Sequence, residues 1–160
     1  MARIPDEVIE RLKDEVARCE EYRLLAGVLD ALVALENKAQ TAIGLGTGNV
    51  ERGAKIKLGR AGIFERFDFG GYGDDSEDRA TVLRRGAERG AQKLGVSFDA
   101  CRVIVIGDTP RDIHAAKAIG AESLAVSNGF IPVADLATHD PTWAVESLDT
   151  NEAKSALDLA

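Results

Sequence analysis

A chain of 160 residues has the size of a single domain with one hydrophobic core, and its balance of 45% hydrophobic and 29% charged residues excludes a disordered chain. The formal net charge of −7 argues against nucleic acid as a partner, because basic surfaces bind a phosphate backbone. No apolar run reaches the roughly 18 residues of a membrane span, and the acidic start of the chain lacks the apolar centre of a signal peptide. We therefore expect a cytoplasmic protein without membrane association.

Two helices are predicted at the start of the chain, over residues 5–18 and 24–36. The first carries an apolar stripe at helical spacing, formed by Val8, Ile9, Leu12 and Val16. Both helices are amphipathic, so each needs a core to cover.

The rest of the chain alternates short apolar runs with helical patterns. Strands are expected at residues 41–47, 67–69, 102–108 and 123–129, and helices at 49–62, 77–94 and 110–120. The run RVIVIGD, residues 102–108, is β-branched and apolar on both faces, which is typical of a central strand in a parallel sheet. This alternation predicts an open α/β fold with a parallel sheet.

Polar residues follow the predicted strands at the places where ligands bind. In an open parallel sheet, ligands lie beyond the carboxyl ends of the strands. The residues that follow the carboxyl ends of the predicted strands include Thr47, Asp108 and Asp112, and Arg79 follows the glycine-rich stretch 70–78. A hydroxyl, a guanidinium and two carboxylates can together hold a phosphoryl group and a Mg²⁺ ion.

Each of these residues also has a purely structural interpretation. Thr47 and Asn49 can shape a turn and cap the helix that follows. Asp112 can cap the N-terminus of its helix, and Arg79 can form surface ion pairs with nearby acidic residues. The structural alternative is weakest for Asp108, because a carboxylate that ends a buried strand is costly unless it is paired or binds metal.

Two strings of the sequence carry a specific resemblance to a known family. GLGTGNVERGAKIKLGRAGIFERFDFGGYGDDSEDR, residues 44–79, and VIVIGDTPRDIHAAKAIGA, residues 103–121, resemble motifs two, three and four of the haloacid dehalogenase superfamily, especially its phosphoglycolate-phosphatase-like members. The resemblance covers nearly all of residues 24–148. It implies a three-layer Rossmann-like core over residues 37–160, preceded by residues 1–36 as a remnant of a helical cap with its linker helix.

The resemblance implies a phosphatase that hydrolyses a small phosphorylated metabolite. Thr47 would donate a hydrogen bond to the phosphoryl group, and the neighbouring Gly48 and Asn49 would complete its binding loop. Arg79 would replace the basic residue, lysine in most members, that balances the charge of phosphate and nucleophile. Lys57 lies inside the predicted helix after the first strand, so it is a poorer candidate for that position.

The resemblance also implies Mg²⁺ as the cofactor. Asp108 would coordinate the ion, and Asp112 would hold the coordination shell in place. The family's chemistry begins with a DxDGT-like motif, whose first aspartate attacks phosphorus and whose second acts as general acid and base. No apolar strand in this sequence is followed by DxD. We therefore expect a fragment or degenerate member that begins inside the cap and has no turnover by itself.

The absent motif also removes a strand from the expected sheet. In the resembled fold that strand lies between the strand ending at Thr47 and the strand ending at Asp108. Its absence leaves two unpaired edges in the interior. We expect these strands to pair directly, or a complementing chain to fill the gap, or the chain to form a homodimer through it.

Two other classes of function stay open. A dinucleotide-binding module is the first, because the glycine-rich turn GLGTG, residues 44–48, can cradle a pyrophosphate. Asp68 lies near the position of a ribose-binding acid, although the last glycine of the fingerprint falls at Asn49. The second is an interaction module whose exposed gap recruits a partner.

Several other polar residues have no predicted role at the site. Arg84, Arg85 and Arg89 are assigned to the solvated face of their helix, while His114 and His139 have no partner that the sequence identifies.

Overall fold

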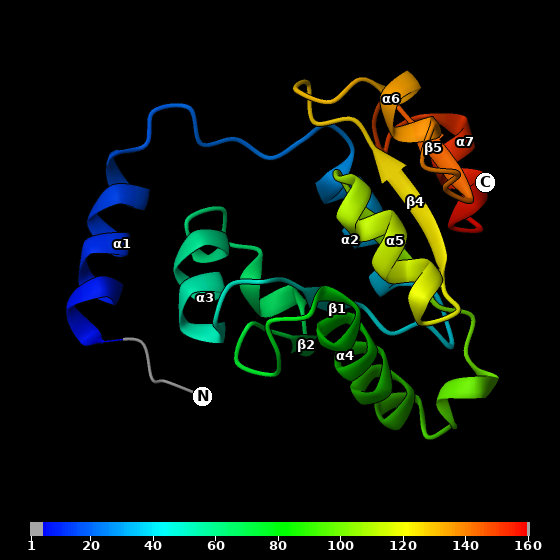
Figure 1. Cartoon of the computed structure of the whole chain (residues 1–160), viewed down its shortest axis with the longest axis horizontal. Helices are drawn as coiled ribbons and strands as arrows, with labels where there is room; N and C mark the ends of the chain where they lie inside the picture. Colours follow the sequence, from blue (N-terminus) through cyan, green and yellow to red (C-terminus); the bar gives the residue numbers. More distant parts are fainter. Residues whose placement is uncertain (1–4, 160) are drawn as a thin grey trace.

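The computed structural model describes residues 5–159 as a chain of short parallel strands separated by helices (Figure 1). The helices are α1 (Asp6–Arg18), α2 (Val28–Glu36), α3 (Glu51–Gly59), α4 (Arg79–Leu94), α5 (Pro110–Ala118), α6 (Val133–Ala137) and α7 (Asn151–Ala156). The strands are β1 (Gly44–Gly46), β2 (Phe69–Gly71), β3 (Ile104–Gly107), β4 (Glu122–Val126) and β5 (Trp143–Val145). None of the helices described between residues 5 and 159 is long and apolar enough to cross a membrane.

The strands form two parallel sheets rather than one. β1 pairs with β2, and β3, β4 and β5 pair in that order. Within residues 5–159, neither β1 nor β3 has a strand on its other edge. The α/β fold with an interrupted parallel sheet is therefore confirmed, and direct pairing of the two strands beside the interruption is not observed. β3 was expected to be central, but here it is an edge strand and its Ile106 is 41% exposed.

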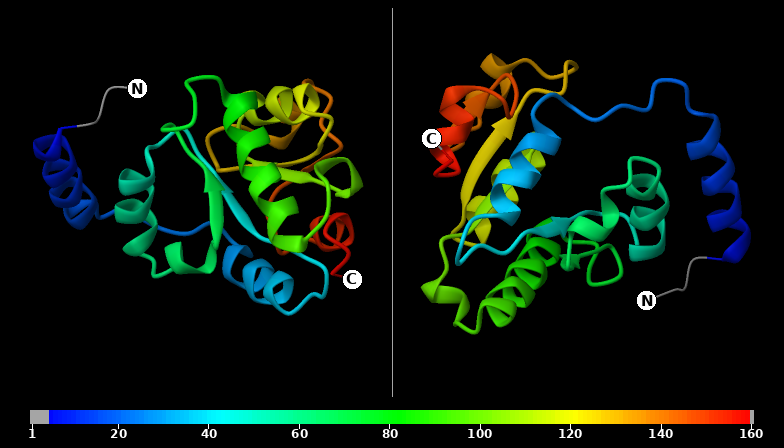
Figure 2. Two further views of the ribbon diagram at one scale, coloured as in Figure 1. Left: turned by 90° about the horizontal axis from the view of Figure 1, so that it is seen from below. Right: turned by 180° about the vertical axis from the view of Figure 1, so that it is seen from behind.

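Helices cover both faces of the sheets. On one face α4 packs on β1 and β2, α5 packs on β3 and β4, and the two helices contact each other. On the opposite face α7 packs on β5, and Leu35 of α2 joins the apolar cluster around Leu124 and Val145 (Figure 2). Leu83 of α4 lies against Gly46 of β1 and shares an apolar cluster with Val105 of β3. The helical layer is thus continuous beneath an interrupted sheet.

The backbone of α4 touches the backbone of β2. A side chain at Gly71 would overlap the carbonyl oxygen of Val82, and one at Gly86 would reach the amide of Gly71. Only glycine permits this approach, because it has no Cβ. The contact fixes how α4 lies on the sheet, and with it the place of Arg79 at the start of the helix.

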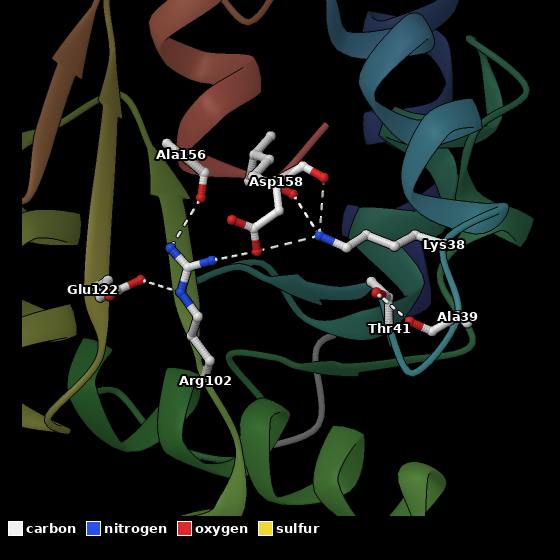
Figure 3. A network of polar contacts seen from close by, with 8 residues as sticks. Lys38, Ala39, Thr41, Arg102, Glu122, Ala156 and Asp158 are labelled. Carbon is white, nitrogen blue, oxygen red and sulfur yellow. Dashed lines mark hydrogen bonds and ion pairs between the residues drawn. The ribbon is translucent and has the colours of Figure 1, made fainter. Parts of the chain in front are cut away.

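A polar network connects the amino ends of the two sheets (Figure 3). Lys38, before β1, donates hydrogen bonds from Nζ to the carbonyl oxygen of Leu157 at 2.9 Å and to Asp158 Oδ2 at 3.3 Å. Arg102, before β3, donates to the same Asp158 oxygen at 2.7 Å. These hydrogen bonds tie the chain before both strands to the segment after α7, and Arg102 also donates to Glu122 of β4 at 2.8 Å.

The opening helices have different surroundings. α1 packs on α3, where Ile9 is buried and Asp6 pairs with Arg52. α2 lies against the sheet, and the amide of Leu148 donates to the carbonyl oxygen of Ala26. α2 begins later than expected because Gly27, with φ of 79°, interrupts the helix. The division into a cap remnant and a core at residue 36 stays a prediction.

Candidate functional site

The loops that follow β1 and β2 are tied together. The amide of Thr47 donates to the carbonyl oxygen of Gly71 at 3.0 Å, and the amide of Gly73 donates to that of Asn49 at 2.9 Å. Asp74 Oδ2 accepts from the amide of Glu51 at 2.7 Å, at the N-terminus of α3. The acidic stretch after β2 therefore caps the helix after β1. Of the structural alternative for Thr47 and Asn49, the turn is observed, but capping by Asn49 is not, because Asp74, distant in sequence, accepts from the first amide of α3.

A second set of hydrogen bonds surrounds the hydroxyl of Thr47. Its Oγ1 accepts from the backbone amide of Asn49 at 3.1 Å and from Asn49 Nδ2 at 2.8 Å. Lys57, in the last turn of α3, donates from Nζ to Asn49 Oδ1 at 2.8 Å. Helical side chains lean toward the N-terminus, which lets this long side chain reach back to the loop. Lys57 is thus connected to Thr47 through Asn49, although the sequence made it the poorer candidate for the basic residue of the site.

Arg79 pairs with Asp112 across two helix N-termini. Its Nε and one terminal nitrogen donate to Asp112 Oδ1 at 3.0 and 2.6 Å, and Thr109 Oγ1 donates to Asp112 Oδ2 at 2.8 Å. The side chain of Asp112 is 9% exposed and that of Arg79 is 29% exposed. Arg79 is therefore the partner of a buried carboxylate, rather than a solvated residue that answers the acids beside it in sequence.

Gly107 makes room for this carboxylate. A Cβ on Gly107 would overlap the Cβ and the carboxyl group of Asp112. The close approach places Asp112 directly against the end of β3, beside Asp108. The glycine of the GDxxxD string is thus required by packing.

Asp108 leaves β3 with one oxygen engaged. Its Oδ2 accepts from Asn128 Nδ2 at 3.0 Å, and Oδ1 accepts no hydrogen bond from the described residues. Asn128 follows β4, so the rule that strand ends carry polar site residues would have identified it. The amide holds Asp108 at the carboxyl edge of the sheet.

The protein residues fit only part of a Mg²⁺ shell. Asp108 has one oxygen that could serve as a ligand, but both oxygens of Asp112 already accept hydrogen bonds. Over residues 5–159 no group of three or more His, Cys, Asp and Glu side chains is placed to hold a metal. Asp112 therefore fits a supporting position better than a direct one.

The loop after β2 contains another ion pair, between a half-buried carboxylate and an exposed arginine. Asp75 accepts two hydrogen bonds from Arg89, at 2.6 and 2.8 Å, and one from the amide of Tyr72 at 2.9 Å. The hydrogen bonds from Arg89 hold the pKa of the Asp75 carboxyl below its ordinary value. Arg89 is exposed, as expected for the solvated face of α4, and its guanidinium also fixes the loop through Asp75.

The remaining candidates have ordinary neighbours. Asp68, considered as a ribose-binding acid, pairs with Lys93 of α4. His114 and His139, for which the sequence identified no partner, place their rings 5.2 Å apart in an edge-on arrangement. The sequence-predicted site residues therefore form two groups, Thr47 with Asn49 and Arg79 with Asp112, while Asp108 joins Asn128 at the same edge.

Comparisons with known proteins identify the family and the fold. The chain is 23% identical over 141 residues to the phosphoglycolate phosphatase of Synechococcus elongatus, covering 88% of this chain and 63% of that enzyme. Two solved structures share the fold. One is a haloacid dehalogenase-like family hydrolase from Streptococcus pneumoniae, with a TM-score of 0.65 and 18% identity over 99% of this chain and 82% of that one. The other, described as a predicted phosphoglycolate phosphatase from Haemophilus somnus, has a TM-score of 0.66 and 21% identity over 94% of this chain and 61% of that one.

The family model for haloacid dehalogenase-like hydrolases matches residues 2–120, which include β1, β2, β3 and every predicted site residue. This match spans well over half of the chain. The chain therefore belongs to the haloacid dehalogenase-like hydrolase family.

Proposed function

We propose that this chain forms the phosphate-binding half of a phosphatase that hydrolyses a small phosphorylated metabolite of the phosphoglycolate kind. The observation that carries the proposal is the set of polar groups at the carboxyl ends of β1 and β3. Thr47 with Asn49 follows β1, and the Arg79–Asp112 pair lies beside Asp108 after β3. Donors beside an anchored carboxylate suit a phosphoryl group and its cation. The phosphoglycolate phosphatase from Synechococcus supports this substrate class.

We further propose that the chain by itself does not turn over substrate. Its groups can hold charge, but a covalent mechanism needs an aspartate that attacks phosphorus, and no DxD follows an apolar strand in this sequence. Asp108 can supply one Mg²⁺ ligand, and further carboxylates would have to complete the shell.

The interruption between β1 and β3 supports a partner for this half. Both edges leave backbone groups without a strand, and Ile106 is exposed beside them. An extended segment that pairs with both strands would satisfy these groups and cover the side chain. Such a segment belongs to a complementing chain in this proposal, and a homodimer is its alternative. Sedimentation over a range of concentrations distinguishes them, because only the homodimer assembles without an added partner.

Phosphate binding tests the proposed site directly. Inorganic phosphate, titrated into the chain by calorimetry, should bind, and Thr47→Val should weaken binding by about tenfold or more, because a hydrogen bond to a charged group is lost. Thr138→Val is the matched control. Thr138 lies outside the proposed site, and its hydroxyl donates to the carbonyl oxygen of the nearby Asp135. Absence of phosphate binding by the unmodified chain would exclude the proposed function.

Turnover tests the second part of the proposal. With Mg²⁺ and either p-nitrophenyl phosphate or phosphoglycolate, the chain should show negligible hydrolysis. A rate of about 1 per second, the lower end of ordinary enzyme turnover, that disappears in Asp108→Asn would show that the chain is a complete enzyme.

A further inference from the structure

Three side chains form a row of hydrogen bonds that ends at the Thr47 hydroxyl. Lys57 Nζ donates to Asn49 Oδ1 at 2.8 Å, and Asn49 Nδ2 donates to Thr47 Oγ1 at 2.8 Å. The backbone amide of Asn49 donates to the same hydroxyl oxygen at 3.1 Å. All three side chains are only partly exposed.

Lys57 determines which way the amide of Asn49 faces. An ammonium group has only donors, so the atom of Asn49 that meets it must be the carbonyl oxygen. The NH₂ group of the same amide then faces Thr47. An asparagine without such a neighbour can turn its amide over, since oxygen and nitrogen exchange places at little steric cost. The charge on Lys57 therefore decides that Thr47 receives a donor.

The Thr47 hydroxyl is consequently left with one function. A hydroxyl oxygen has two lone pairs and one hydrogen, and two N–H groups of Asn49 occupy the lone pairs. Among residues 5–159 no group accepts a hydrogen bond from this hydroxyl. The hydroxyl is thus available to a bound group only as a donor, and that group must carry an acceptor oxygen.

The charge of Lys57 adds to this preference. In the part of the chain that the structure describes, no carboxylate lies within 4.0 Å of its ammonium group, whereas Lys38, Lys55 and Lys117 each have one. The hydroxyl of Tyr22 donates to the backbone carbonyl oxygen of Lys57 at 2.6 Å, which anchors the last turn of α3 and leaves the ammonium group to Asn49. Arg79 differs, since Asp112 already balances its charge.

We propose that Lys57 is a positioning residue for the anion site. It acts through the Asn49 amide, holds the Thr47 hydroxyl as an obligate donor and has no contact with the bound phosphoryl group. This inference rests on the proposed function, since it explains why Thr47 would accept a phosphoryl oxygen and reject a donor group. Lys57 on α3 then supplies the positive charge beside the loop that contains Thr47.

Four variants separate this role from a general structural one. Lys57→Met removes the charge and the donor, and should weaken inorganic phosphate binding by about tenfold, the effect of one misdirected hydrogen bond. Lys57→Arg restores a donor-only group and should recover most of the affinity. Asn49→Asp should remove phosphate binding, because its second oxygen accepts the Thr47 hydrogen. Tyr22→Phe is the control, because it removes a hydrogen bond to the backbone of α3 and leaves the Lys57 side chain in place; it should lower stability while phosphate affinity stays unchanged.

Nuclear magnetic resonance of the Asn49 side-chain amide gives a readout that needs no ligand. In the unmodified chain its two Nδ2 protons should differ in chemical shift and exchange slowly with solvent, and Lys57→Met should remove this protection while circular dichroism stays unchanged. Unaltered Asn49 signals in Lys57→Met would overturn the inference, as would unaltered phosphate affinity. A chain that binds no phosphate but loses the Asn49 protection would refute the proposed function and leave the positioning role supported.

Discussion

Removal of Arg79 should cost more stability than neutralisation of Asp112. In Arg79→Ala the carboxylate stays at a side-chain exposure of 9%, with only the Thr109 hydroxyl as a donor. Breaking a fully buried pair costs about 3–5 kcal/mol, and the 29% exposure of Arg79 admits some water, so we expect about 2–3 kcal/mol. In Asp112→Asn no buried charge remains and Arg79 can turn to solvent, which gives about 1–2 kcal/mol.

The double variant isolates the pair. Arg79→Ala with Asp112→Asn should cost less than the sum of the single changes by about 1 kcal/mol or more, because the neutral amide no longer needs the guanidinium. Urea unfolding followed by circular dichroism, with fluorescence of Trp143, the single tryptophan, measures these energies. For Arg79→Ala the midpoint should fall by about 1–2 M at an ordinary slope of about 1–3 kcal/mol per M.

The control is Arg111→Ala, an exposed arginine in the first turn of α5 with no ion pair among the described contacts. It should change stability by less than about 0.5 kcal/mol. If the changes in the free energy of unfolding were strictly additive, or if Arg79→Ala were as stable as this control, the buried pair would be refuted. Arg79 would then be a solvent-exposed residue without a partner at Asp112.

Two further predictions concern the surroundings of the site. Asp75→Asn should destabilise the fold by about 1–2 kcal/mol at neutral pH, because the partly exposed Arg89 loses its bidentate acceptor. The pKa of Asp75 is lower in the folded state than in the unfolded chain. The stability difference between the unmodified chain and Asp75→Asn should therefore be complete above the ordinary carboxyl pKa of 3.8 and shrink as pH falls below it. Urea titrations at several pH values measure this difference. Gly107→Ala should cost about 1–3 kcal/mol and weaken phosphate binding, since its Cβ would displace Asp112; unchanged melting and affinity would show that α5 can move away freely.

Much of the fold could be predicted because its signals are local. The apolar run 102–108 and the helical pattern after Pro110 come from residues adjacent in sequence, and they gave β3 and α5 to within a few residues. The elements after residue 129 were not predicted, because α6, β5 and α7 are short and lack strong periodicity. The strand before α4 was shifted, since Gly70 and Gly71 look like a turn although they pair with Leu45 and Gly46.

The sequence by itself determined which groups stand at the strand ends: Thr47 after β1, and Asp108 and Asp112 after β3. It also indicated the interruption between these strands, through the absent motif. Only the tertiary structure decided how the groups are used. Arg79 meets Asp112 because the glycine contact between α4 and β2 sets where that helix begins, and Lys57 meets Asn49 because its long side chain reaches back along α3 to the loop. Spacing along a chain fixes residues within one element, whereas a pair between two elements depends on how those elements pack.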